Sequence, residues 1–189
     1  MAQVLARALL AGIIFSAAVQ TAVLRAGMES PTLPGHIRVL DRRLADVIAC
    51  GIQRSATLRR MVDRIAELDG IIYVTATVKV RPETNHVLRA ALVHEVAVAG
   101  TSRILRVVVA HNHGDDAVAT IAHELQHATE VLESPGVRSA ADVTALFKRI
   151  GREVYAGVWE TVEAGNIERT VAQELRASRS DPRCDASQW

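Results

Sequence analysis

The chain has 189 residues, of which 49% are hydrophobic and 23% are charged, and its formal net charge at pH 7 is +1. This length suits one domain with a substantial core and is short for two. The near-zero charge argues against nucleic-acid binding, which needs a basic excess, and an aromatic content of 3% argues against a base-stacking surface. We therefore expect one folded domain that does not bind nucleic acid.

The first 26 residues differ from the rest of the chain. Arg7 precedes an apolar run over residues 8–19, and small and polar residues follow it. A basic start, a short apolar centre and small residues near a cleavage position are typical of a secretory signal peptide. An uncleaved membrane anchor is one alternative, because residues 8–24 are just long enough to span a membrane, and a buried core helix is another. We expect residues 1–26 to be a signal peptide or an N-terminal membrane anchor.

If this segment directs export, the protein works in the periplasm or is secreted. Cys50 and Cys184 are the two cysteines, and in an oxidising compartment they could form a disulfide. The sequence does not say whether they lie close enough, so a disulfide and two separate thiols both stay open.

A linker and two helices come next along the chain. Residues 27–38 are rich in Pro, Gly and Ser, which is typical of a linker. Apolar residues then repeat at helical spacing from Leu40 to Ile48. Ser55 is a suitable N-cap for a second helix, which Asp69 and Gly70 would end.

Three strands are predicted in the middle of the chain. Residues 71–80 alternate and are rich in β-branched side chains. Residues 88–100 and 103–111 form two further β-like runs, separated by a tight turn at residues 100–102. Because these two runs are so close in sequence, we expect them to pair as antiparallel strands.

Three helices should complete the domain. The first is predicted over residues 118–132 with Asp115 or Asp116 as its cap, and the second over residues 140–150 with Ser139 as its cap. The third is predicted over residues 155–175, and a polar tail covers residues 179–189. An order of helices, strands and then helices indicates an α+β fold.

The segment His123-Glu124-Leu125-Gln126-His127 carries the chemistry of this chain. Residues four apart on a helix lie on one face, so both imidazoles can reach one metal ion. Glu124 points about 100° away round the helix. It therefore cannot join them as a ligand, but it can take a proton from a water molecule at the metal. This pattern indicates a catalytic zinc site.

Catalytic zinc normally has three protein ligands and one open position, so a third ligand is needed. Glu130 is too far along the helix axis from His123, and we expect it to support a ligand histidine instead. The last predicted helix offers four glutamates, and Glu160 is the best candidate because it lies among apolar neighbours. Glu163, one turn further on, is the second candidate. The others are Glu168 and Glu174.

With a glutamate downstream of His123-Glu124-x-x-His127, the chain resembles the gluzincin metallopeptidases. The stretch from "IAHELQHATEVLESPGVRSAADVTALFKRIG" to "WETVEAG" is also similar to small bacterial proteins with a zincin-like core. The similarity covers about residues 104–175. It departs from the family pattern at Trp159, where phenylalanine is usual, and after Glu160, where the match is loose. The resemblance implies a zincin-like domain, assigned to residues 39–178.

The resemblance also implies roles for individual residues. His123, His127 and Glu160 would bind Zn²⁺, and Glu124 would be the catalytic base. The strand over residues 103–109 would be an edge strand that pairs with an extended peptide substrate; the alternative is that this strand belongs to the core.

Several further residues have weaker signals. Tyr155 could donate to the oxyanion of peptide hydrolysis, although packing is the commoner role of such a tyrosine. We interpret His111-Asn112-His113 as a polar loop and not as a nuclease motif. The other histidines are isolated, and we expect surface or core positions for them: His36, His86 and His94.

The sequence thus predicts a monomeric zinc-dependent hydrolase, a metallopeptidase with a peptide or protein substrate. Two alternatives stay open. One is a zinc-binding module without catalysis on a zincin frame, which would bind zinc and hydrolyse nothing. The other is a helical protein in which the motif occurs by chance, with its glutamates far from His123. The distance between the glutamates and the histidine pair distinguishes the last alternative from the other two.

Overall fold

The computed structural model of the protein describes residues 33–77, 88–110, 114–155 and 157–178. The chain divides into two units, residues 1–31 and 32–189, and every described residue belongs to the second. The expected signal or anchor segment and the polar tail lie outside the described residues, as do the end of the predicted strand over 71–80, the loop with His111 and His113, His86 and Cys184. No helix within these four ranges is long and apolar enough to cross a membrane.

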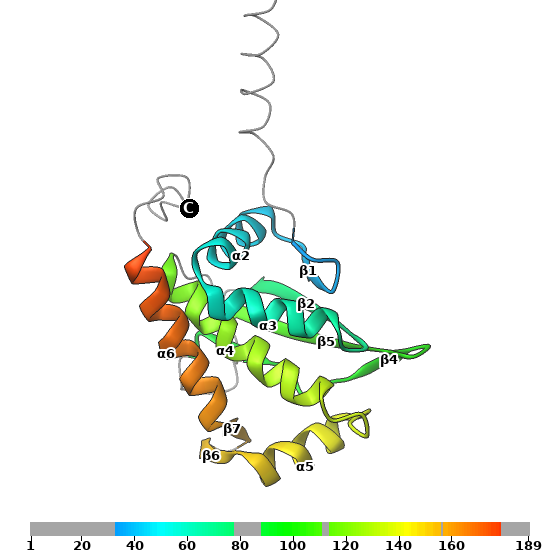
Figure 1. Ribbon diagram of the computed structural model, residues 1–189. Coiled ribbons are helices and arrows are strands. Elements are labelled where there is room, and N and C mark those ends of the chain that lie inside the picture. Colours follow the sequence, from blue (N-terminus) through cyan, green and yellow to red (C-terminus); the bar gives the residue numbers. More distant parts are fainter. Residues whose placement is uncertain (1–32, 78–87, 111–113, 156, 179–189) are drawn as a thin grey trace, which may run out of the picture. The chain divides into compact units, whose positions relative to one another are not determined.

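The described residues combine helices with a mixed sheet, which is compatible with the α+β class that we predicted (Figure 1). The elements in chain order are β1 (Ile37–Val39), α2 (Arg42–Arg54), α3 (Ala56–Ala66), β2 (Gly70–Thr77), β3 (Ala90–Leu92), β4 (Ala97–Ala99), β5 (Ser102–Ala110), α4 (Asp115–Leu132), α5 (Ala140–Ile150), β6 (Arg152–Tyr155), β7 (Val158–Glu160) and α6 (Val162–Ala177).

Strand β5 lies inside the main sheet and not at its edge. It pairs in parallel with β2, which pairs in parallel with β1, and it pairs on its other side with β3 and β4. The expected antiparallel pairing of the two runs around residues 100–102 is confirmed. The expectation that residues 103–109 form an edge strand is wrong, because β2 and β3 occupy both sides of β5. The alternative, a core strand, is what the structure has.

The predicted strand over residues 88–100 is split in two. β3 pairs with the second half of β5 and β4 with its beginning, so both lie along one side of β5. Between them the chain turns locally, since the Glu95 N–H donates to the Val93 carbonyl at 2.7 Å. The interruption leaves β3 as a short edge strand on the side of the sheet that faces α4.

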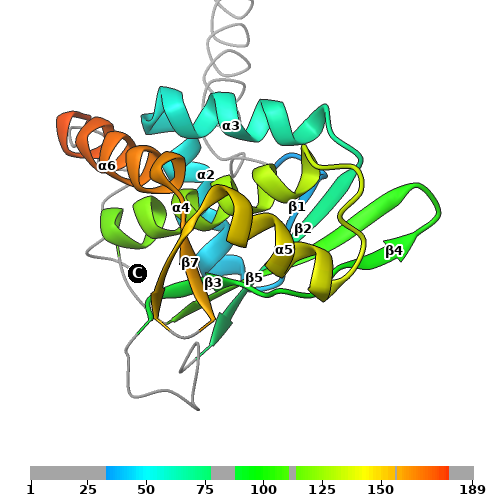
Figure 2. The same cartoon turned by 90° about the horizontal axis from the view of Figure 1, so that it is seen from below.

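Alternation along the strands separates a helix-covered face from a more open face. In β5 the buried side chains are at odd positions, among them Leu105, Val107 and Val109. These side chains join one core cluster with the apolar residues of α3 and α4. Helix α4 lies between the sheet and α6, as the two views in Figures 1 and 2 show. The helix that carries both histidines is therefore central, and most of its residues are buried.

Two of the predicted helix caps are confirmed and one is wrong. Ser55 and Ser139 accept from the backbone of Leu58 and Asp142, as N-caps do. Helix α4 begins at Asp115 after Gly114, which has a φ of 76° and makes no side-chain cap. Asp115 is not a cap because its carboxylate binds Arg54, at 2.6 and 2.9 Å.

The last predicted helix begins later than expected, so Glu160 is not on a helix. Strands β6 and β7 pair as an antiparallel hairpin before it, and Gly157 has a φ of 73°, a conformation that residues with a side chain rarely adopt. Thr161 then caps α6 by accepting from the Ala164 N–H at 3.2 Å. Glu160 is the last residue of β7, directly before this cap. The sequence signals for this arrangement are Gly157 and the Thr161 cap.

Strand β1 begins inside the segment that we interpreted as a linker. Ile37 pairs with Ile72 and is only 3% exposed, so the end of the 27–38 segment belongs to the folded unit. The buried side chains of β2 face the same core as Ile37 of β1, and this shared burial holds the short strand β1 against β2.

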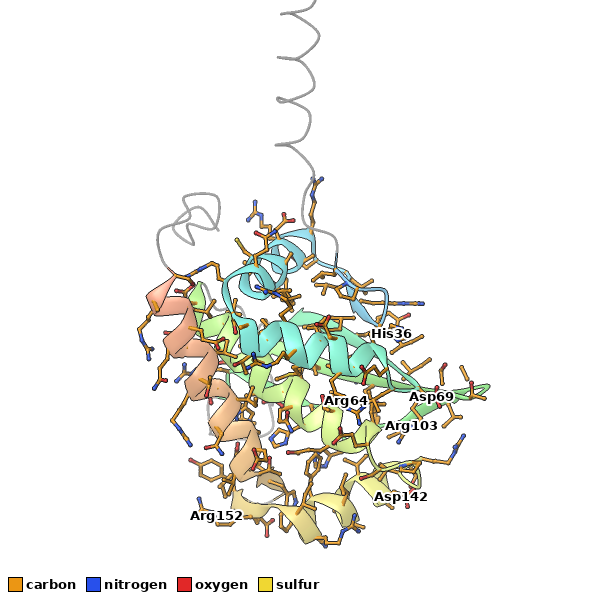
Figure 3. The ribbon with its side chains drawn as sticks, viewed as in Figure 1. His36, Arg64, Asp69, Arg103, Asp142 and Arg152 are labelled. Carbon is orange, nitrogen blue, oxygen red and sulfur yellow. The ribbon has the colours of Figure 1, made fainter. Side chains whose placement is uncertain are left out.

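A buried arginine fixes the far end of α4. Arg103 of β5 is 5% exposed, and its guanidinium donates to the carbonyls of Val131 at 2.9 Å and Ser134 at 2.8 Å (Figure 3). It also donates to the Leu132 carbonyl. The Val131 and Leu132 carbonyls belong to the last turn of α4, where a helix leaves carbonyls without intrahelical partners, and Ser134 follows the helix. Arg103 therefore ties the helix that carries the histidines to the centre of the sheet.

Candidate metal centre

The two histidines of the motif are buried side by side on α4. His123 is 7% and His127 5% exposed, and their ring centroids are 4.8 Å apart at an interplanar angle of 78°. Phe147 of α5 packs edge-on against the His127 ring, with 5.1 Å between centroids. Imidazoles in the interior of a protein need polar partners, and the elements around α4 supply them.

Glu160 reaches the histidines from the end of β7. Its Oε2 lies 3.1 Å from His123 Nε2. One ligand atom each from His123, His127 and Glu160 lies within 4.8 Å of the others, which makes a group that could hold a metal ion. The structure thus brings together the three residues that we predicted as ligands, although Glu160 comes from a strand.

A further carboxylate lies next to the Nδ1 atom of each imidazole. Glu130 Oε2 lies 3.0 Å from His127 Nδ1, and Glu130 Oε1 accepts from the Thr161 hydroxyl at 2.8 Å. This contact confirms that Glu130 supports a histidine. Glu168 of α6 lies 3.2 Å from His123 Nδ1, at ion-pair distance but without hydrogen-bond alignment. We had noted Glu168 as one of four glutamates near the C-terminus without giving it a role.

The carboxylates dominate the charge of this cluster. Burial disfavours the charged form of His123, but Glu160 and Glu168 outweigh burial and raise the pKa of His123 to about 10. Burial also opposes ionisation of Glu160, yet His123 lowers the pKa of this carboxyl below its usual value. His123 itself lowers the pKa of Glu168. The group therefore favours positive charge at its centre.

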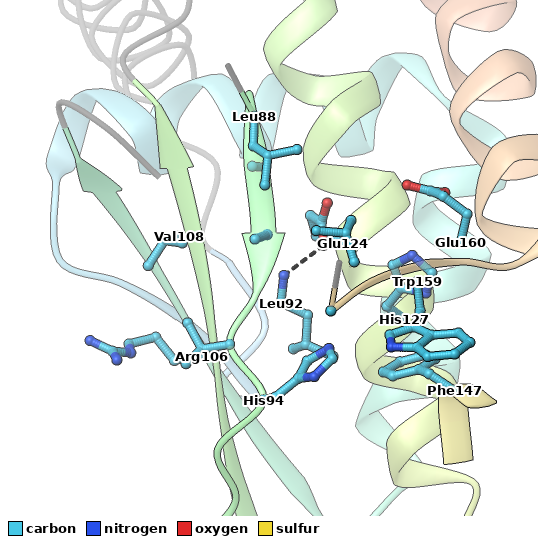
Figure 4. A pocket seen from close by; sticks show the side chains of 15 residues that line it. Leu88, Leu92, His94, Arg106, Val108, Glu124, His127, Phe147, Trp159 and Glu160 are labelled. Atoms are coloured by element: carbon cyan, nitrogen blue, oxygen red, sulfur yellow. Dashed lines mark hydrogen bonds between the residues drawn. The ribbon is translucent and has the colours of Figure 1, made fainter. Parts of the chain in front are cut away.

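Glu124 differs from these carboxylates because it is buried against the edge strand. It is 8% exposed, and its Oε2 accepts from the Leu92 N–H at 2.6 Å (Figure 4). Burial raises the pKa of Glu124, although the two histidines and the Leu92 amide oppose this effect. A carboxyl with a raised pKa, next to a possible metal site, is better suited to accepting a proton than an ordinary glutamate is.

A cleft of about 450 Å³ opens between β3, α4 and the β6–β7 hairpin (Figure 4). Its wall includes Glu124, His127 and Glu160, so two of the three residues of the candidate metal group line it. Apolar and aromatic side chains form most of the remaining wall, a composition typical of ligand sites. They include Leu88, Leu92, Val108, Phe147, Val158 and Trp159.

His94 is a residue of the cleft that sequence reasoning missed. It follows β3 where the edge is interrupted, lines the cleft, and stacks on Phe147 with 5.5 Å between ring centroids. We interpreted it as an isolated histidine, because nothing in its neighbourhood in the sequence indicates the local turn. His36 is indeed part of the fold, since its Nδ1 lies 3.0 Å from the Gly70 carbonyl oxygen.

The two other predicted residues are not members of this group. Glu163 is exposed in the first turn of α6 and is not part of the three-residue metal group. Tyr155 of β6 is 48% exposed and is not among the residues that line the cleft. The catalytic role of Tyr155 therefore stays a prediction without support from the position of its side chain.

No family model, curated protein or solved structure matches this chain.

Proposed function

We propose that this protein is a zinc-dependent hydrolase, and specifically a metallopeptidase of gluzincin type. The observation that carries the proposal is that Glu160, from a distant part of the sequence, meets His123 and His127 of α4 beside a cleft whose wall includes His127 and Glu160. Two imidazoles and one carboxylate are a ligand set that catalytic zinc uses, and three ligands leave a position open. Carboxylates behind both imidazoles match the partners that zinc-bound histidines have in proteins.

A zinc ion in this group would act as a Lewis acid toward the substrate carbonyl and would make water more acidic. Glu124 is the base in this proposal: it takes a proton from the attacking water and passes it to the departing amine. Its raised pKa suits both steps, because the carboxyl must accept and then release a proton. The apolar wall of the cleft, with Phe147 and Trp159, would reduce the access of bulk water.

The edge strand supports a peptide as the substrate. Within the described residues β3 pairs only with β5, and its other side faces the cleft. Backbone groups on a free strand edge bind extended peptides by main-chain hydrogen bonds. The substrate strand that we assigned by resemblance to residues 103–109 is therefore reassigned to β3. Export of the protein stays part of the proposal, on the N-terminal sequence alone.

The proposal is tested first by zinc content. We expect one zinc per purified wild-type chain and a sharp loss of zinc in Glu160→Gln, because the amide is a poor ligand. Glu163→Gln is the matched control, since it removes a nearby exposed glutamate and should keep the metal. A folded wild-type chain that takes up no zinc when supplied with it would overturn the proposal and favour a chance motif.

Peptide hydrolysis is the second test. A zinc-loaded wild-type chain should cleave members of a mixed peptide library, and Glu124→Gln should bind zinc equally and cleave the same peptides about 10²–10⁴-fold more slowly. Tight zinc binding without cleavage of any peptide would favour the alternative, a zinc-binding module without catalysis.

A further inference from the structure

The main-chain groups of β3 point alternately toward β5 and toward the cleft. The Val93 N–H donates to the Arg106 carbonyl, and the Arg89 carbonyl accepts from the Ala110 N–H, so residues 89 and 93 face β5. In an antiparallel pair this direction alternates with every residue. Ala90 and Leu92 therefore direct their backbone groups to the free side of the strand.

One of these free-side groups is already bound by the proposed catalytic base. The Leu92 N–H donates to Glu124 Oε2 at 2.6 Å, which is the short distance typical of a hydrogen bond to a carboxylate. Both partners are buried, with Leu92 7% and Glu124 8% exposed, so water does not compete strongly for this bond. A carboxylate held through one oxygen keeps a fixed position and leaves its second oxygen for other contacts.

We propose that β3 divides its free edge between two tasks. The Leu92 amide positions Glu124, and the main-chain groups of Ala90 are those that pair with an extended substrate. The positioning of Glu124 concerns a contact within this chain, and the pairing of Ala90 with a substrate rests on the proposed peptidase function. Because the Leu92 N–H is bonded to Glu124, it cannot also donate to a substrate. An extended substrate must therefore pair with the main-chain groups of Ala90, and this sets its register along β3.

The first test measures hydrogen exchange of backbone amides in the metal-free protein by NMR. We expect the Leu92 amide to exchange about tenfold faster or more in Glu124→Ala, the ratio that loss of one such hydrogen bond gives. The Ala91 amide, which faces β5 like its neighbours 89 and 93, should not change. An unchanged Leu92 rate would overturn the positioning role without reference to catalysis.

The second test uses proline to delete single N–H groups from the edge, a position where strands tolerate proline. Leu92→Pro should lower kcat by about tenfold or more and leave KM within about twofold, because the base is misplaced while pairing is kept. Leu92→Ala is its control, since it loses the side chain but keeps the N–H. Ala90→Pro should instead raise KM and spare kcat.

These outcomes separate the inference from the proposed function. If wild type binds zinc but cleaves nothing, the peptidase proposal fails while the exchange result still decides the Leu92–Glu124 contact. If wild type cleaves peptides and Leu92→Pro behaves like Leu92→Ala, the positioning role is wrong. If Leu92→Pro does not fold, the exchange measurement on Glu124→Ala decides alone.

Discussion

Helix α6 contacts two polar clusters, and the two differ in how fully their charges are matched. Its first half faces the histidines of α4 through Glu168, and its last turns face α2 and α3 through Glu174 and the Leu175 carbonyl. Both clusters combine buried or half-buried charges from distant parts of the sequence. The difference in their partners distinguishes a cluster that holds the fold together from one that is suited to bind a cation.

In the cluster at the end of α6 every oxygen of Glu174 has a donor. Oε2 accepts from the Ser55 hydroxyl at 2.5 Å and the Thr57 N–H at 3.0 Å, and Oε1 accepts from the Thr57 hydroxyl at 2.9 Å. Next to it, Arg54 donates to the Asp115 carboxylate and to the Leu175 carbonyl. Fully satisfied networks of this kind fix the relative positions of helices.

In the cluster around α4, carboxylates outnumber their cationic partners. Four carboxyl groups surround two imidazoles, with His123 shared between Glu160 and Glu168. The carboxylates are Glu124, Glu130, Glu160 and Glu168. Excess negative charge in a buried place is unfavourable unless a cation compensates it. We infer that the cluster around Glu174 serves stability and that the cluster around the two histidines serves binding and catalysis. Substitutions in the two clusters should separate these effects.

The largest effect is expected for Glu124→Gln. Loss of the proposed base should lower peptide hydrolysis by about 10²–10⁴-fold while zinc content and folding stay unchanged. The measurement is steady-state hydrolysis of a peptide identified in the library screen, beside metal analysis of the same sample. Activity within a few-fold of wild type would show that another group is the base.

Asp115→Ala should give the largest loss of stability. It leaves Arg54 without its carboxylate at a site where the two side chains are 9% and 16% exposed, and breaking such a pair costs about 3 kcal/mol. Urea unfolding of the metal-free protein measures the change. Asp116→Ala is the control, because Asp116 is exposed in the same helical turn. Equal losses in both variants would mean that the helix terminus, and not the ion pair, is responsible.

Substitution of the carboxylates behind the histidines should have an intermediate effect on metal binding. We expect Glu130→Gln and Glu168→Gln each to weaken zinc binding by about 10–100-fold, since these groups orient the imidazoles. Competition with a chromophoric chelator provides the affinity. A similar loss in Glu174→Gln would contradict the separation of the two clusters.

Glu174→Gln should have the smallest effect, and that effect should depend on pH. Burial would raise the pKa of Glu174, but hydrogen bonds from Ser55 and Thr57 outweigh it and lower the pKa in the folded protein. Its stabilisation is therefore complete above the unfolded pKa of about 4.3 and is lost as the pH falls through the lower folded pKa. At pH 7 we expect a loss of about 1 kcal/mol in the free energy of unfolding.

Unfolding curves of wild type and Glu174→Gln at a series of pH values measure this difference. The two stability curves should converge as the pH falls below about 4. A constant gap between pH 7 and pH 3 would mean that the carboxylate charge of Glu174 is not what holds α6 against α3.

Much of the site on α4 could be predicted from the sequence because its information is local. The spacing of His123 and His127 fixes one helical face, and the spacing of Glu130 from His127 predicts the contact that the structure has. The caps at Ser55 and Ser139 were predicted for the same reason, since capping involves only nearby residues. The antiparallel pairing around residues 100–102 follows from a short connection.

Several of the elements that were predicted wrongly depend on contacts between distant segments. The β6–β7 hairpin is an exception: apolar residues around Glu160 fit a helix as well as a hairpin, and the helical interpretation did not use the local signals of Gly157 and the Thr161 cap. Residues 103–109 were predicted to be an edge strand because the short connection indicated one antiparallel partner. In the structure β2 is a second, parallel partner. Asp115 was predicted to be a cap, but its carboxylate instead accepts from Arg54 of α2.

The sequence by itself determined the pair of histidines, the proposed base Glu124 and the helix that carries them, because helical geometry relates residues four positions apart. Only the tertiary structure decided that Glu160 and not Glu163 joins the histidines, that Glu168 contacts His123, and that β3 contacts Glu124. These contacts join residues about 30 or more positions apart. Their positions depend on how the sheet, α4 and α6 bury one shared core, which no local pattern of residues specifies.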